Sequence, residues 1–226
     1  MLLAAVLTPL VASCSHGTTA AKPTTGGSGV AARPLSSDEA DLLAVTRFNA
    51  YRAKMLSVTG TIVSGTAATD VTLHGWIDTV NEQGYGLVTP SQGGEFLAVW
   101  NTTQISAQDY NGSTPPLPRP QKGWSTTGLK ASDSALAAAQ LVLLGLSSDR
   151  PDNPQLLLQD GATWQGTGNV DGVKVDIMGG PLATGATVSN LRYWIDSLGQ
   201  LRRVQARLDG RDWSTFDLAT ASGIKF

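Results

Sequence analysis

An uncharged stretch at residues 135–146 constrains the fold of this chain more than any other feature. It consists almost entirely of Ala, Leu and Val and contains no charged residue. Ser132 or Ser134 can cap a helix here, and Pro151 prevents that helix from continuing. Because such a helix is apolar all round and too short to cross a membrane, it has to be covered on two sides. We expect a sheet to cover one side and either another helix or a bound lipid to cover the other.

Segments with the alternating pattern of β-strands occur on both sides of this helix in the sequence. Before it they are residues 58–63, 71–78, 85–88 and 96–100, joined by short connections rich in turn-forming residues. After it, hairpins are predicted around Asp171-Gly172 and around 197–199, and a last strand at 212–218. In the strand at 200–208, Arg203, Gln205 and Arg207 are interpreted as a solvated basic face. The chain is therefore predicted to be an α+β protein with an antiparallel sheet.

Two further helices are predicted. Ser36, with Glu39 three residues later, has the pattern of a capping box that opens the first one. Its predicted buried stripe has the spacing of an amphipathic helix and consists of Val45, Phe48, Tyr51 and Met55. A second, short helix is predicted at 155–159. The segment 115–120 contains four prolines in six residues, which excludes regular structure and indicates either a simple connector or a rigid flap.

The N-terminal residues indicate an exported lipoprotein. An apolar run at 2–10 is followed by Val11-Ala12-Ser13-Cys14, with small residues at the two positions before the cysteine. Cys14 is predicted to carry a diacylglycerol and to anchor the protein on the extracytoplasmic face of the cell membrane. The alternatives are a truncated secretory signal and a small buried thiol. Because no Lys or Arg precedes Cys14, we expect the true start codon to lie upstream of Met1.

This interpretation divides the chain into three parts. Residues 1–13 are the signal segment, and residues 14–35 are a flexible tether rich in Gly, Thr, Ala, Ser and Pro. Residues 36–226, roughly 190 in number, are predicted to form a single domain. Cys14 is the only cysteine, so no internal disulfide can form and the domain is held by packing alone. A net charge of −2 gives no argument for nucleic acid as a partner.

The sequence contains few residues suited to catalysis. It has two histidines, and because His16 lies in the predicted tether, His74 stands alone. The sequence has no Gly-x-Ser-x-Gly motif, no second cysteine for a zinc site and no phosphate-binding loop motif. We therefore predict no enzyme activity, no metal and no cofactor. His74 is interpreted as a packed or half-exposed strand residue.

Five short segments of the C-terminal half form a recognisable pattern, and they are Asn153-Pro154-Gln155-Leu156-Leu157, Gly161-Ala162, Val170-Asp171-Gly172-Val173, Tyr193-Trp194-Ile195-Asp196 and Leu201-Arg202-Arg203-Val204. This pattern resembles the actinobacterial lipoproteins of the LppX/LprG group, which are similar in fold to the bacterial lipoprotein carrier LolA. In element order the resemblance covers most of residues 36–226. It implies a strongly curved antiparallel half-barrel, whose concave face is covered by helices and encloses an apolar cavity for acyl chains.

The resemblance therefore predicts that the protein binds a lipid or glycolipid for transport or presentation. Acylated Cys14 is expected to hold it at the cell membrane. An envelope transporter is a possible partner. The candidate cavity residues come from the apolar helix, the first helix and the second strand, and they are Leu141, Val142, Leu144, Leu146, Phe48 and Leu73. The alternatives are a protein-binding envelope sensor on a LolA-like scaffold and a structural lipoprotein of the cell envelope.

Overall fold

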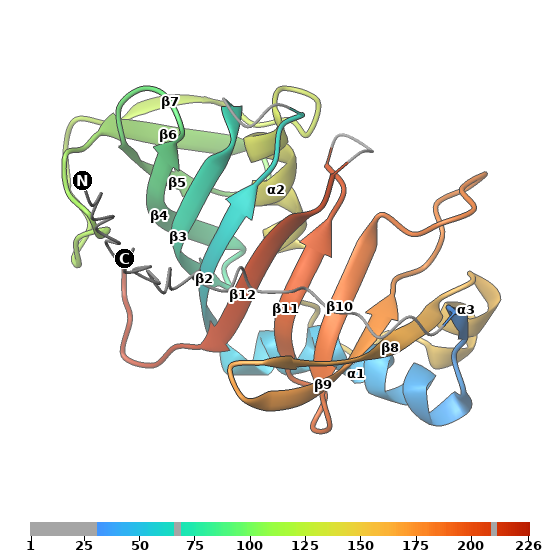
Figure 1. Ribbon diagram of the computed structural model, residues 1–226. Helices are drawn as coiled ribbons and strands as arrows, with labels where there is room; N and C mark the ends of the chain where they lie inside the picture. Colours follow the sequence, from blue (N-terminus) through green and yellow to red (C-terminus); the bar gives the residue numbers. More distant parts are fainter. Residues whose placement is uncertain (1–30, 66–68, 209–211) are drawn as a thin grey trace, which may run out of the picture.

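The computed structural model describes residues 31–65, 69–208 and 212–226, which form one open antiparallel sheet with three helices. The strand order across this twelve-stranded sheet is β1-β8-β9-β10-β11-β12-β2-β3-β4-β5-β6-β7, with every neighbouring pair antiparallel. The strands are β1 Arg33–Pro34, β2 Met55–Ile62, β3 Val71–Asp78, β4 Gln83–Pro90, β5 Phe96–Trp100, β6 Gln104–Asp109, β7 Ser125–Gly128, β8 Thr163–Val170, β9 Val173–Gly179, β10 Leu191–Asp196, β11 Leu201–Ala206 and β12 Ser214–Thr220. The predicted α+β class with a curved antiparallel sheet is confirmed (Figure 1).

The helices are α1 Ser37–Ala53, α2 Ala135–Leu144 and α3 Pro154–Gln159, and all three lie on one face of the curved sheet (Figure 1). α2 packs on β2, β3 and β4, whereas α1 packs against α3 and against β10 and β11. The main core lies between these helices and the sheet. The sheet therefore covers one side of the apolar helix α2, as its sequence requires, and α1 covers a different part of the same face.

Helix α1 begins as the sequence predicts but buries a different stripe. Ser36 is its N-cap and forms the capping box with Glu39. The buried residues of the helix are mostly small, namely Ala40, Leu43, Ala44, Thr46 and Ala50. The predicted stripe is wrong, because Val45, Phe48 and Tyr51 remain half-exposed and Met55 already belongs to β2. Small side chains let the helix axis approach the sheet and α3 closely, and this close approach decides which side faces inward.

The two halves of the sheet join through β12 and β2, which pair from Thr215 opposite Thr61 to Thr220 opposite Leu56. The predicted hairpin at Asp171-Gly172 connects β8 and β9 and is confirmed. Both turn residues have positive φ, 50° and 82°, which is the backbone that a two-residue hairpin loop requires.

The face of the sheet opposite the helices carries a smaller core under the proline-rich loop. Tyr85, Leu87 and Leu97 form this core, and Trp124 packs against it from the end of the loop. The Tyr85 hydroxyl donates to the Pro116 carbonyl oxygen over 2.8 Å. The loop is thus a cover over β4, and this strand is buried on both of its faces for most of its length.

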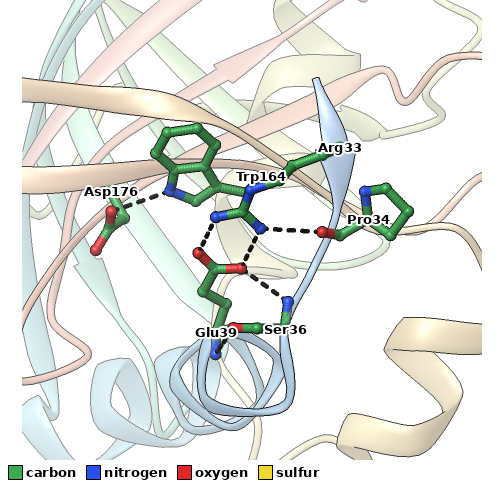
Figure 2. Close-up of polar contacts among 6 residues, drawn as sticks. All are labelled: Arg33, Pro34, Ser36, Glu39, Trp164 and Asp176. Carbon is green, nitrogen blue, oxygen red and sulfur yellow. Dashed lines mark hydrogen bonds and ion pairs between the residues drawn. The ribbon is translucent and has the colours of Figure 1, made fainter. Parts of the chain in front are cut away.

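The folded domain begins earlier than the sequence predicts. Arg33–Pro34 forms β1 on the edge strand β8, and Leu35 is buried in the main core. Figure 2 shows that the Arg33 guanidinium is held by the Glu39 carboxylate above the ring of Trp164. The last three residues of the predicted tether, 33–35, therefore belong to the domain. Their role depends on contacts with β8 and α1 that composition does not reveal.

Candidate functional site

A pocket of about 410 Å³ lies between α1, α3 and β10, on the helix-covered face of the sheet. Its lining comes from α1, from the connection that follows α2, from α3, from β10 and from the loop between β9 and β10. The lining residues are Leu43, Thr46, Arg47, Gly145, Asp152, Asn153, Leu156, Leu157, Asp160, Pro181, Leu191 and Tyr193. This volume lies within the range of small-molecule binding pockets, which is roughly 300–1,000 Å³.

The inner part of the pocket is apolar. Leu43, Leu157 and Tyr193 are buried there, and each belongs to the main core. Burial raises the pKa of the Tyr193 phenol to about 12, although the nearby charge of Arg47 opposes this effect. Tyr193 is therefore a neutral side chain at physiological pH and adds to the apolar character of the wall.

Polar groups form one side of the pocket. The Arg47 guanidinium pairs with the Asp152 carboxylate over 2.9 Å, and its Nε donates to the Gly145 carbonyl oxygen over 3.0 Å. The backbone N–H of Asp152 in turn donates to the carbonyl oxygen of Ala44 over 2.9 Å. These bonds fasten α1 to the connection between α2 and α3, and they place a satisfied ion pair beside the apolar wall.

Leu156 marks the mouth of the pocket. It lies on the short helix α3, which Asn153 caps through a hydrogen bond from the Gln155 backbone N–H. Its side chain lines the pocket, yet 52% of its surface is exposed to solvent. A leucine in this position extends the apolar wall of the pocket to the molecular surface.

The six residues predicted to face a lipid cavity occupy other places. Leu73, Leu144 and Leu146 are buried in the main core, whereas Leu141, Val142 and Phe48 are half-buried. None of the six lines the pocket, although Gly145, which lies between Leu144 and Leu146, does. Their contact with lipid stays a prediction.

The pocket itself was missed by sequence reasoning, although one signal pointed to it. α3 contains three consecutive leucines, 156–158, and a helix of six residues cannot bury three leucines on one side. Part of the remaining wall comes from α1, more than 100 positions earlier in the sequence, and part from Pro181, Leu191 and Tyr193, more than 20 positions later. No local pattern brings these segments together.

The other predicted functional residues lie away from this pocket. Cys14 lies outside the described residues. His74 is exposed on β3, with its ring centroid 6.2 Å from that of Trp76. The described residues contain no group of three or more His, Cys, Asp or Glu side chains that could hold a metal ion. Among the helices described, none has both the length and the apolar character needed to cross a membrane.

Comparison with known proteins gives similarity at the level of structures alone. No protein-family model matches the chain, and no curated protein matches it. The chain is similar to the lipoprotein LppX of Mycobacterium tuberculosis, with 17% identity, a TM-score of 0.42 and coverage of 80% of this chain and 93% of LppX. It is also similar to LprF of Mycobacterium bovis, with 16% identity, a TM-score of 0.43 and coverage of 84% and 93%.

A more distant likeness is to a putative outer membrane lipoprotein-sorting protein domain from Vibrio parahaemolyticus, with 10% identity, a TM-score of 0.26 and coverage of 84% and 95%. LppX and LprF are lipoproteins of the group that the sequence resembles.

Proposed function

We propose that this protein is a membrane-anchored envelope lipoprotein that binds an acyl chain of a lipid or glycolipid in the pocket between α1, α3 and β10, for transport or presentation. The observation that carries the proposal is the composition of this pocket. Its inner wall consists of Leu43, Leu157, Leu191 and Tyr193, and one side carries a paired arginine and carboxylates. An amphipathic ligand matches such a wall, with its chain inside and its polar end beside the ion pair.

The charges beside the pocket favour an uncharged polar end on the ligand. Arg47 is already neutralised by Asp152, and Asp160 adds a second carboxylate to the lining. An anionic headgroup would face these carboxylates, whereas the hydroxyl groups of a sugar or glycerol can donate to them. Within the class of lipids, the lining thus supports a glycolipid or a neutral acylglycerol.

The titratable groups at the pocket support a binding role and not a catalytic one. General acid–base catalysis works best with a group whose pKa lies near the working pH. The Tyr193 phenol has a pKa of about 12, and the Arg47 charge is engaged with Asp152. Neither group suits proton transfer at neutral pH.

The place where the N-terminal tether would join the domain supports a membrane-anchored carrier. β1 leads into α1, and Leu43 lies six residues after the first residue of that helix, which is about 9 Å along its axis. A tether from Cys14 would therefore join the domain at the N-terminal end of α1, and the middle of this helix lines the pocket. The exposed Leu156 at the pocket mouth offers an apolar entrance for a chain that leaves a membrane.

The proposal is tested by substitutions that fill the pocket. All of them are made in the full chain that carries Cys14→Ser, because this substitution removes the proposed anchor. Leu157→Trp and Leu191→Trp add bulk to the pocket wall, and we expect both variants to lose co-purified lipid in native mass spectrometry and to lose binding of a fluorescent fatty acid. Leu87→Trp is the matched control, because Leu87 is buried in the small core on the opposite face. Overpacking there should cost about 1–3 kcal/mol of stability, but the folded protein should still bind the fatty acid.

Two outcomes would contradict the proposal. One is fatty-acid binding that is the same in Leu157→Trp, Leu191→Trp and the parent chain. The other is a parent chain that carries no lipid after purification and takes up none in the assay. In the second case a protein-binding role becomes the better hypothesis.

A further inference from the structure

Two arginine side chains meet one tryptophan ring on the face of the sheet opposite the pocket. Arg192 lies on β10 between Leu191 and Tyr193, whose side chains line the pocket, so the alternation of the strand places Arg192 on the other face. Arg207 follows the end of β11, and Trp213 precedes β12. The Cζ atoms of Arg192 and Arg207 lie 4.2 Å and 4.4 Å from the centroid of the Trp213 ring.

In the part of the chain that the structure describes, these two arginines contact no carboxylate. The side chains of both make cation–π contacts with Trp213, and the Nε of each is buried without a hydrogen-bond partner. Four other arginines of the domain have close acidic partners, which are Glu39 for Arg33, Asp152 for Arg47, Asp196 for Arg202 and Asp217 for Arg203. Arg192 and Arg207 instead bring two cations without a carboxylate partner onto one tryptophan ring.

The two charges are held close to each other and partly away from water. Burial lowers the pKa of the Arg192 guanidinium, and the positive charge of Arg207 lowers it further. Contact with the Trp213 ring attracts each cation, but the ring carries no net charge and cannot neutralise them. Such a pair of cations is stabilised when an anion binds between or beside them.

The chemistry of the arginine side chain suits recognition of an oxyanion. A guanidinium that stacks on an aromatic ring uses its flat face for the ring and keeps its N–H groups directed outward in its own plane. Those N–H groups can donate to two oxygens at once, in the bidentate geometry that carboxylates and phosphates accept. Both arginines are half-exposed, so part of each side chain is accessible to a ligand.

We propose that Arg192 and Arg207, in cation–π contact with Trp213, form a binding site for a phosphate group. Two guanidinium groups supply more donors than the two oxygens of a carboxylate can accept, whereas a phosphate has three or more oxygens. A phosphate also carries up to two negative charges at neutral pH, which match the two unpaired cations. The site is independent of the proposed acyl-chain pocket, because it lies on the other face of the sheet and shares no residue with it.

The phosphate group can belong to a lipid headgroup or to a free anion, and the two sources are distinguished by separate titrations of the full chain with Cys14→Ser. The first titration uses inorganic phosphate and follows the ¹H–¹⁵N signals of the arginine Nε–Hε groups. We expect saturable shifts of the Arg192 and Arg207 signals, and a melting temperature that rises with phosphate but not with sodium chloride at the same ionic strength. The second titration uses vesicles of phosphatidylglycerol in the same buffer and follows the same arginine signals.

Arg192→Gln and Arg207→Gln should each weaken phosphate binding on the order of tenfold or more, because each removes a charged donor pair. Arg207→Lys keeps the charge but not the planar donor pair, and it should bind with intermediate affinity. Arg150→Gln is the matched control for net charge, since Arg150 is a highly exposed arginine, and it should bind as the parent chain does. Leu157→Trp, in the other pocket, should also leave phosphate binding unchanged.

Binding of either phosphate source that depends on Arg192 and Arg207 supports the proposal and identifies that source. The proposal is overturned if neither source shifts the two arginine signals. It is also overturned if the Gln variants, folded by circular dichroism, bind as tightly as Arg150→Gln does. Each Gln variant loses one cation–π contact with Trp213 but is relieved of the repulsion between the two cations. Both variants should therefore melt close to the temperature of the parent chain in phosphate-free buffer.

Discussion

The guanidinium of Arg33 donates to both carboxylate oxygens of Glu39, over 2.6 and 2.7 Å, and so joins the edge strand β1 to the first turn of α1 (Figure 2). The backbone N–H of Ser36 donates to the same carboxylate over 2.8 Å. The Arg33 guanidinium also lies 4.4 Å from the ring centroid of Trp164, whose indole N–H donates to Asp176 over 3.1 Å. One carboxylate thus links the strand, the helix cap and the edge of the sheet.

This arrangement predicts a pH-dependent attachment of β1. The hydrogen bond from Arg33 is the main reason that the pKa of Glu39 falls to about 2, with further lowering by Ser36 and with burial acting in the opposite direction. Because the folded-state pKa lies below the unfolded value of about 4.5, Glu39 stabilises the fold fully above pH 4.5 or so. That contribution is lost as the pH falls from about 4.5 towards about 2.

The measurement is the free energy of unfolding of the parent chain and of Glu39→Gln as a function of pH. We expect the parent to be the more stable at pH 7 and the difference to shrink steadily below pH 4.5. Arg33→Gln should reduce the pH dependence in the same way, since it removes the partner. Asp38→Asn removes a carboxylate from the same turn and controls for the change in net charge. A stability difference between parent and Glu39→Gln that is constant from pH 7 to pH 2 would contradict the assignment.

A second prediction concerns the anchor. Cys14→Ser should release the protein from the membrane fraction without changing its fold, because the acyl chains on Cys14 are the proposed membrane contact. The measurement is the partition of the full chain between membrane and soluble fractions after a salt wash, with circular dichroism of the released protein. If the variant still sediments with membranes, acylation of Cys14 is not the anchor.

The elements that the sequence predicts well are those whose signals are local. The capping box of Ser36 and Glu39, the hairpin at Asp171-Gly172 and the burial of α2 each depend on residues that are neighbours in the chain. β6 and β7 were missed because both are short and mainly polar, without a clear alternation of apolar residues. β7 is the exposed edge strand, and the half-buried β6 lies next to it.

The candidate pocket was beyond prediction for a different physical reason. Leu43, Leu157 and Tyr193 become neighbours only when α3 packs on α1 and α1 packs against β10. Arg207 shows the same limit, because its alternation with Arg203 and Gln205 is interpreted as a solvated face. Arg192 and Arg207 form a pair of cations only in the folded structure, where β10, β11 and the start of β12 place both side chains on the Trp213 ring.

A third prediction separates the pocket from the cavity that the sequence placed against α2. Leu144 and Leu146 are buried in the main core, so Leu144→Trp and Leu146→Trp should each cost about 1–3 kcal/mol by overpacking and leave fatty-acid binding intact in the folded protein. Leu141 and Val142 are half-buried, and Leu141→Trp and Val142→Phe should change stability little. The measurements are the melting temperature and the displacement of a fluorescent fatty acid. Substitutions at Leu144 or Leu146 that abolish lipid uptake at unchanged stability would instead place the acyl chain against α2.

A fourth prediction concerns Gln140, the polar residue at the centre of α2. Its side chain is 0% exposed, and both its Nε2 and its Oε1 lack a hydrogen-bond partner among the described residues. Its backbone carbonyl oxygen accepts a hydrogen bond from the indole N–H of Trp100 over 3.3 Å. A buried polar group without a partner costs roughly 1–3 kcal/mol. Gln140→Met keeps the length of the side chain and removes both groups.

We therefore expect Gln140→Met to raise the free energy of unfolding by about 1–3 kcal/mol in urea titrations, with an unchanged dependence on urea concentration. Gln205→Met is the matched control, because Gln205 is also buried but its Nε2 donates to the Thr215 hydroxyl over 2.9 Å. The same chemical change should there lower the stability, by about 1 kcal/mol, since it leaves the hydroxyl unpaired. A Gln140→Met variant that is destabilised, as Gln205→Met should be, would contradict this prediction. The Gln140 amide would then have a hydrogen-bond partner in solution, such as an ordered water. In that case a polar contact would hold α2 in addition to its apolar surface.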